Sequence, residues 1–172
     1  MEDAFTIDEL DRDGAIRETA EKAGVDTRGS FLKKAALGAG AVAGSGAFLG
    51  ALPSLASAGT IPASDIAILN FALTLEYLES AFYAEAIKKA GLAGQVKKLA
   101  QEIGDHENQH VTALTEAIKK SGGKPVKAPK VAFPLSDEAS FLKLAKTFED
   151  TGVAAYDGAA PMIKSKEVLA AA

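Results

Sequence analysis

Apolar residues recur every three to four positions along three long stretches of the chain, the spacing that places them on one face of an α-helix. The pattern predicts helices over about residues 66–90, 95–121 and 136–157. A short turn between Gly91 and Gly94 separates the first two, so they are expected to lie antiparallel as neighbours. The first helix is apolar on more than one face, which indicates burial on several sides.

Serine residues stand where two of these helices begin. Ser64 is the predicted N-cap of the first helix, with Asp65 in its first turn, and Ser136 is the predicted N-cap of the third. A serine hydroxyl accepts a hydrogen bond from the unpaired N–H groups of a first turn, and an acidic side chain there suits the helix dipole.

A long connection joins the second and third helices. Residues 122–135 contain Pro125, Pro129 and Pro134, which excludes a helix and favours extended backbone. These fourteen residues reach about 45 Å when extended, whereas a helix of 20 residues is about 30 Å long. The connection can therefore run the length of a bundle and start the third helix parallel to the second.

Glu107 and His110 lie three residues apart in the second predicted helix, so their side chains share a face. His106 is expected to lie off this line. Burying a carboxylate and an imidazole is costly unless a metal ion or a hydrogen-bond network pairs with them. The Glu-x-x-His spacing alone is a weak signal, since short motifs often match by chance. The shared face is otherwise apolar and carries Val96, Leu99, Ile103, Leu114 and Ile118.

A glutamate and a tyrosine recur with the same spacing in the other two helices. Glu76 and Tyr83 are seven residues apart in the first helix, as are Glu149 and Tyr156 in the third. Paired helices of this kind aim their carboxylates at one point, and each tyrosine hydroxyl is expected to hydrogen-bond a carboxylate across the core. Glu79 lies close to the same face and is a second candidate on the first helix. The alternative is incidental charges on ordinary amphipathic helices.

The composition of the chain excludes several classes of function. A chain of 172 residues with 48% hydrophobic content suits one ordinary domain. It contains no cysteine, which excludes disulfides, thiolate metal sites and a cysteine nucleophile. Its formal net charge of −4 argues against a nucleic-acid partner.

The first 58 residues differ from the rest and are predicted to be a polar segment followed by an export signal. Residues 15–23 are compatible with a short helix. An uncharged run, residues 35–55, then leads to Ala56-Ser57-Ala58, which is a cleavage signature. The predicted domain boundary thus separates residues 1–58 from a helical domain of residues 59–172. The protein is expected to be exported, periplasmic or extracellular; an uncleaved membrane anchor through residues 35–55 is the alternative.

The basic stretch before the apolar run, from Thr27 to Lys34, resembles a twin-arginine translocation (Tat) signal, although Gly29 stands where the second arginine belongs. General secretion is the alternative route. A Tat signal would imply transport of a folded protein.

The helical part of the chain resembles the ferritin-like superfamily of di-iron carboxylate proteins. One glutamate on each of two helices, Glu-x-x-His on another and a long crossover make up that pattern. Residues 69–79 and 147–153 look like the secreted bacterial branch related to plant desiccation-related proteins. The resemblance implies an all-α bundle and iron as the cofactor, with manganese or zinc as alternatives. It also implies metal ligands at Glu76, Glu107, His110 and Glu149, with Tyr83 and Tyr156 as their supporting partners.

The chain departs from the family pattern at the fourth helix. Glu167 is the sole glutamate after Asp157, and Ala170 stands where the second Glu-x-x-His needs a histidine. We therefore expect a fourth helix that begins near Ser165 and is truncated, with a di-iron site only if that helix is supplied. The incomplete bundle is expected to expose apolar surface that a homodimer would cover.

Three functions are consistent with these features. The first is an exported metal-binding protein in iron oxidation, iron handling or protection against oxidative or desiccation stress. The second is a non-catalytic structural or stress-protection bundle with a vestigial metal site, and the third is a membrane-tethered interaction module. Because two-metal oxidation needs both positions, weak or absent Fe(II) oxidation is expected from this chain.

Overall fold

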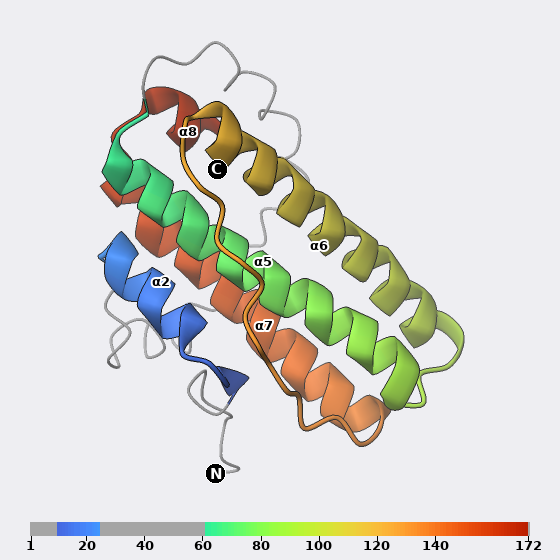
Figure 1. Cartoon of the computed structure of the whole chain (residues 1–172). Helices are drawn as coiled ribbons and strands as arrows, with labels where there is room; N and C mark the ends of the chain where they lie inside the picture. Colours follow the sequence, from blue (N-terminus) through green and yellow to red (C-terminus); the bar gives the residue numbers. More distant parts are fainter. Residues whose placement is uncertain (1–9, 25–60, 172) are drawn as a thin grey trace.

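The computed structural model describes residues 10–24 and 61–171, and it confirms the all-α bundle with a long crossover (Figure 1). The three predicted long helices are present, and their ends agree with the sequence analysis to within three residues. The helices are α2 (Ala15–Ala23), α5 (Ala63–Lys89), α6 (Gly94–Lys120), α7 (Glu138–Ala159), the 3-10 turn η2 (Ala160–Met162) and α8 (Lys166–Ala171).

Helix α5 lies at the centre of the bundle. It packs against α6, α7 and α2, and its buried side chains point in several directions, as its sequence predicts. Phe82 is fully buried and contacts the rings of Tyr83, Phe133, Phe141 and Phe148, with centroids 4.7–5.5 Å apart. This aromatic cluster joins α5, α7 and the crossover, and such contacts add stability beyond the area that they bury.

The segment between α6 and α7 runs along the bundle beside α5 and delivers the chain to the other end (Figure 1). The Asn70 side chain fixes its beginning, because it donates to the Lys124 carbonyl at 3.2 Å and accepts from the Val126 N–H at 2.8 Å. Helix α7 consequently starts at the end where α6 starts, and the two run parallel, as predicted.

Both predicted N-caps are wrong by one or two residues. Helix α7 is capped by Asp137, whose carboxylate accepts the Ser140 N–H at 2.8 Å in a capping box, and not by Ser136. Helix α5 begins after Pro62, and the Ser64 hydroxyl instead donates to Asp65. In each case a neighbour suits the first turn equally well: aspartate is as good a cap as serine, and proline presets the backbone angle.

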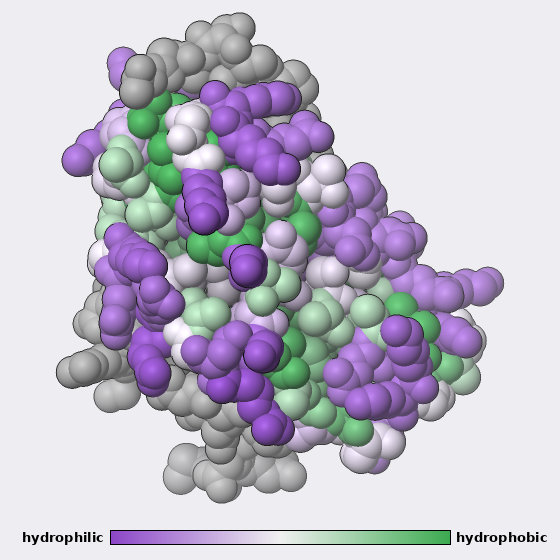
Figure 2. All heavy atoms as spheres, in the orientation of Figure 1, coloured by the Kyte–Doolittle hydropathy of each residue, from purple (hydrophilic) through white to green (hydrophobic). Residues whose placement is uncertain are grey.

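One member of the predicted apolar face of α6 is also misplaced. Leu99 is 48% exposed, whereas Ala100 is 1% exposed and takes the inner position. Ala100 lies seven residues, or two turns, before Glu107 and is therefore better aligned with the buried line. On the face shown in Figure 2, hydrophilic side chains gather along the edge where α6 lies, as expected for an amphipathic helix.

Helix α2 packs against α5 (Figure 1). Its range matches the short helix expected in this region. The residue before it on the same segment, Leu10, and the helix residues Ile16 and Ala20 are each at most 3% exposed. Next to them the Arg12 N–H donates to the Lys130 carbonyl at 3.0 Å, which ties the segment to the crossover. Residues 10–24 thus form part of the packed structure.

The predicted export signal, from Thr27 to Ala58, lies outside the described residues. Among the helices that are described, none is long and apolar enough to span a membrane.

Candidate metal centre

Glu76, Glu107 and His110 meet in the space between α5 and α6. The Nδ1 atom of His110 lies 2.9 Å from Glu107 Oε2 and 3.1 Å from Glu76 Oε2. All three side chains are buried, with residue exposures of 3–6%. One potential ligand atom from each residue lies within 4.8 Å of the other two. Helix α6 supplies two of these atoms because Glu107 and His110 are one turn apart.

The tyrosines connect α5 and α7 by reciprocal hydrogen bonds. Tyr83 on α5 donates to Glu149 Oε1 on α7 at 2.6 Å, and Tyr156 on α7 donates to Glu76 Oε1 on α5 at 2.5 Å. The structure therefore contains both of the cross-core bonds expected from the seven-residue spacing. Each bond holds a carboxylate in place, that of the buried Glu76 or of the half-buried Glu149, which is how groups next to a metal ligand orient it.

The electrostatics of the cluster reflect its burial. Hydrogen bonds to Glu107 and Glu76 raise the pKa of His110 to about 10, so the imidazole carries a proton at neutral pH in the metal-free protein. Burial raises the pKa of Glu107 and that of Glu149. Burial, together with nearby carboxylates, also raises the pKa of Glu79, which lies one turn after Glu76 on α5.

Two glycines that the sequence analysis did not single out make room for this cluster. A Cβ atom on Gly104 of α6 would lie 3.1 Å from Tyr83 Cβ, and one on Gly152 of α7 would lie 2.8 Å from Glu79 Oε1. A glycine inside a helical pattern costs about 1 kcal/mol and often marks a packing requirement, so the signal was present in the sequence. His106 is exposed, as expected, and takes no part in the cluster.

The donor set of Glu76, Glu107 and His110 suits a divalent cation. Two carboxylates and one imidazole are appropriate for Fe(II) or Mn(II), and Zn(II) accepts the same ligands. The Nδ1 atom of His110 faces both carboxylates. In the metal-free protein this nitrogen carries a proton. In a neutral imidazole its lone pair would point at a cation in the same place. All three side chains come from two helices, α5 and α6, and their ligand atoms already lie within 4.8 Å of one another, so the residues fit a metal ion in place of that proton.

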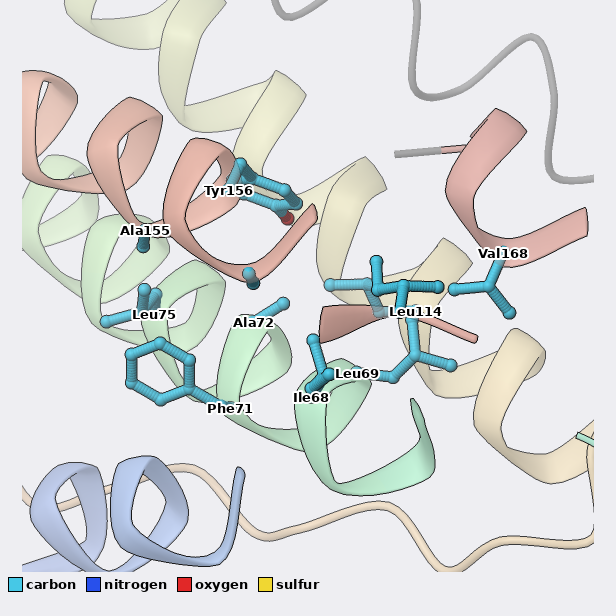
Figure 3. A pocket seen from close by; sticks show the side chains of 11 residues that line it. Ile68, Leu69, Phe71, Ala72, Leu75, Leu114, Ala155, Tyr156 and Val168 are labelled. Atoms are coloured by element: carbon cyan, nitrogen blue, oxygen red, sulfur yellow. The ribbon is translucent and has the colours of Figure 1, made fainter. Parts of the chain in front are cut away.

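An apolar pocket lies beside the cluster, between α5, α6, α7 and α8 (Figure 3). Leu69, Leu75, Leu114 and Val168 contribute to its wall. The tyrosine at its edge, Tyr156, uses its hydroxyl to bind Glu76. Apart from that hydroxyl, the residues that line the pocket are apolar, so the pocket adds no charged ligand to the cluster.

A bundle of long helices with a lengthwise crossover and a buried carboxylate–histidine cluster is the arrangement of those helix bundles whose cores can hold metal ions. The sequence matches the ferritin-like domain family over residues 64–172. The chain belongs to that family. Neither the curated proteins nor the solved structures include a significant match to it.

Proposed function

We propose that this protein binds a divalent metal ion, with iron as the first candidate and manganese or zinc as alternatives, at Glu76, Glu107 and His110. One observation carries the proposal: three ligand atoms of the appropriate types converge within 4.8 Å inside the bundle. Glu149 supports the site from α7 through its bond to Tyr83. When bound, the metal supplies a redox or Lewis-acid centre that is shielded from water.

The biological role that we propose is iron handling or protection against oxidative or desiccation stress outside the cytoplasm. The family membership and the predicted export signal support this role. Cleavage after Ala58 would break the covalent connection between residues 10–24 and the rest of the bundle. These residues include α2, which packs on α5. The intact mass of the protein recovered after secretion tests the proposal: a mass that starts at Gly59 supports export with cleavage, and one that includes Met1 supports an anchor or no processing.

The test of metal binding is an anaerobic titration of the metal-free chain with Mn(II) or Fe(II), followed by calorimetry. Glu107→Gln and His110→Gln each remove one ligand and should weaken binding by roughly a hundredfold, the upper range for groups that support a metal site. Glu102→Gln is the matched control, because Glu102 is an exposed glutamate on the same helix. Equal affinities in all four proteins would show that the metal, if it binds, does so elsewhere.

The second candidate is a structural bundle in which the cluster is only a hydrogen-bond network. It is favoured by the two contacts of the His110 imidazole, which satisfy Glu76 and Glu107 without any metal. In that case a chelator should leave the unfolding temperature of the wild type unchanged, while Glu107→Ala should lower it, since removing one partner of a buried pair leaves the other charge uncompensated. A free metal-ion concentration of a hundred times Kd would instead raise the free energy of unfolding of the wild-type chain by about 2.7 kcal/mol relative to the sample with chelator.

A further inference from the structure

Residues 10–24 form a unit with its own start and stop signals. The Asp11 carboxylate accepts the N–H groups of Ile16 and Arg17 at 3.3 and 3.1 Å, which satisfies the first turn of α2. Gly24 ends the helix with a φ of 76°, a left-handed conformation that glycine adopts without strain. The helix thus begins and ends within the segment, and its place in the molecule depends on the surfaces that it contacts.

The first of these surfaces is the apolar face of α5, beside which α2 lies in Figure 1. Ile16 and Ala20 are almost completely buried, in the same core cluster as Phe71 and Leu75 of α5. An amphipathic helix laid against an apolar surface is a common mode of recognition between separate chains. Here the helix and the surface belong to one chain.

The second surface is the crossover. Asp11 and Val131 pair as an antiparallel bridge, and beside them the Arg12 N–H donates to the Lys130 carbonyl at 3.0 Å. The Lys130 N–H in turn donates to Asp13 Oδ2 at 3.1 Å. The crossover connects α6 to α7, so α2 binds a surface that the folded bundle provides.

The predicted export signal lies between α2 and the bundle along the chain. Residues 27–58 carry its basic stretch, its apolar run and its cleavage signature. An apolar run that crosses a membrane once leaves the residues before it and those after it on opposite sides, and the basic stretch keeps the former on the side of synthesis. Helices in contact lie on the same side. The form in which α2 is packed on α5 and a form that has crossed therefore exclude each other.

We propose that the docking of α2 on α5 and the crossover retains the chain on the side of synthesis, and that export proceeds from the form in which α2 has left the bundle. The inference rests on the proposed export signal and is independent of the metal site. It applies to both routes considered for that signal, because a folded and an unfolded chain alike must separate α2 from α5 before the bundle can cross.

Positions 11 and 131 allow α2 to be tied to the bundle. Opposite residues of such a bridge have Cα atoms about 4.5–5.5 Å apart, which suits a disulfide, and the chain has no cysteine of its own. The full chain with Asp11→Cys and Val131→Cys is oxidised and offered to inverted membrane vesicles that carry the export machinery. Protection of the bundle from added protease measures uptake. The oxidised protein should stay outside, and its reduced form should enter; the wild type should enter equally with and without reductant.

Three single variants test the contact without a disulfide. Ile16→Ala should raise the initial rate of uptake, because truncating a buried isoleucine weakens its contact by about thirtyfold or more, and the rate gains that factor where release of α2 is the slow step. Glu21→Ala, at an exposed position of α2, should keep the wild-type rate. Leu114→Ala leaves a cavity in the other core cluster and should also keep it, which separates the release of α2 from a general loss of stability.

The outcomes distinguish this inference from the proposed export itself. Equal uptake of the oxidised and reduced double variant overturns the role of α2 and leaves export standing. A rate for Ile16→Ala that matches the wild type, or an equal gain in Leu114→Ala, overturns it as well. No uptake of any of these proteins overturns both proposals. Uptake of Ile16→Ala where the wild type stays outside supports the inference most directly.

Discussion

At the scale of single residues, the cluster is organised by pairs in which a neutral or cationic donor faces a buried carboxylate. The tyrosines are the simplest case. Tyr156 donates to Glu76 Oε1 at 2.5 Å from the opposite helix, so its hydroxyl stabilises the carboxylate oxygen that His110 does not contact. Hydrogen bonds to charged groups contribute more than neutral ones, and losing one inside a core leaves the acceptor unsatisfied.

Tyr156→Phe should therefore lower the free energy of unfolding by about 1.5–3 kcal/mol, the usual range for a hydrogen bond to a charged group. Tyr83→Phe, which loses the bond to Glu149, should have an effect of similar size. Urea unfolding in the presence of a chelator measures both. Tyr77→Phe is the control, because Tyr77 is half-buried on α5 and bonds to no carboxylate of the cluster; a loss as large as that in Tyr156→Phe would show that the hydroxyl bonds are not the cause.

The stability of the metal-free protein should fall as pH rises. His110 has a pKa of about 10 in the fold against an ordinary value of 6.5, so its contribution is complete below pH 6.5 and is lost as pH rises through about 10. The raised pKa values of Glu79, Glu107 and Glu149 act in the same direction. Thermal unfolding in a chelator should thus give a midpoint that decreases over this interval.

His110→Gln should flatten that decrease above pH 6.5, because it removes the group whose pKa is about 10 in the fold. Excess Mn(II) should reverse the trend in the wild type, since a bound ion requires deprotonated ligands and its affinity grows with pH. A slope that is the same in His110→Gln and in the wild type would assign the effect to other groups.

At the scale of helices, Asp65 joins the start of α5 to the start of α8. It is completely buried, and its Oδ2 atom accepts the backbone N–H groups of Lys164 and Ser165 at 3.1 and 2.7 Å. The segment before α8 therefore has its position set by a side chain that is distant in the sequence. Val168, which is 1% exposed, depends on this attachment for its place in the smaller core cluster.

Asp65→Ala should release α8 from the bundle. Two part-buried N–H groups, those of Lys164 and Ser165, lose their acceptor, and a typical hydrogen bond contributes about 0.5–1.5 kcal/mol. Hydrogen exchange of the Lys164, Ser165 and Val168 amides should accelerate, while the amides in the middle of α6 keep their protection. Asp105→Ala replaces an exposed aspartate on α6 and should leave the exchange of all these amides as in the wild type.

The sequence predicted the elements well because their signals are local. Apolar periodicity predicted α5, α6 and α7, and the prolines predicted an extended crossover. The shared spacing of Glu76–Tyr83 and Glu149–Tyr156 anticipated the reciprocal bonds of the cluster. The contacts of Asp65 with residues 164 and 165, and of Glu79 with Gly152, connect parts of the chain that no periodic pattern relates, so they required the fold.

At the scale of the whole molecule, the least expected feature is that a polar N-terminal segment packs into the structure. The sequence predicts a domain boundary after residue 58, with a polar segment and an export signal before it. Leu10, Ile16, Ala20 and Ala23 nevertheless belong to the same core cluster as the aromatic residues of α5 and α7. Three apolar side chains on one face of α2, together with Leu10 just before it, are enough once a central helix presents an apolar surface to them.

Helix α2 should therefore unfold together with the bundle. Ile16 is 1% exposed, and Ile16→Ala should reduce the free energy of unfolding by about 2–5 kcal/mol because it leaves a cavity between α2 and α5. Chemical unfolding of the full chain, followed by circular dichroism, measures this loss as a shift of one transition. The matched control is Glu21→Ala, which changes an exposed residue of the same helix and should alter the value by no more than about 0.5 kcal/mol. If Ile16→Ala leaves the transition where it is, the contact of α2 with α5 contributes nothing to the folded state, and removing residues 1–58 would have no energetic consequence for the bundle.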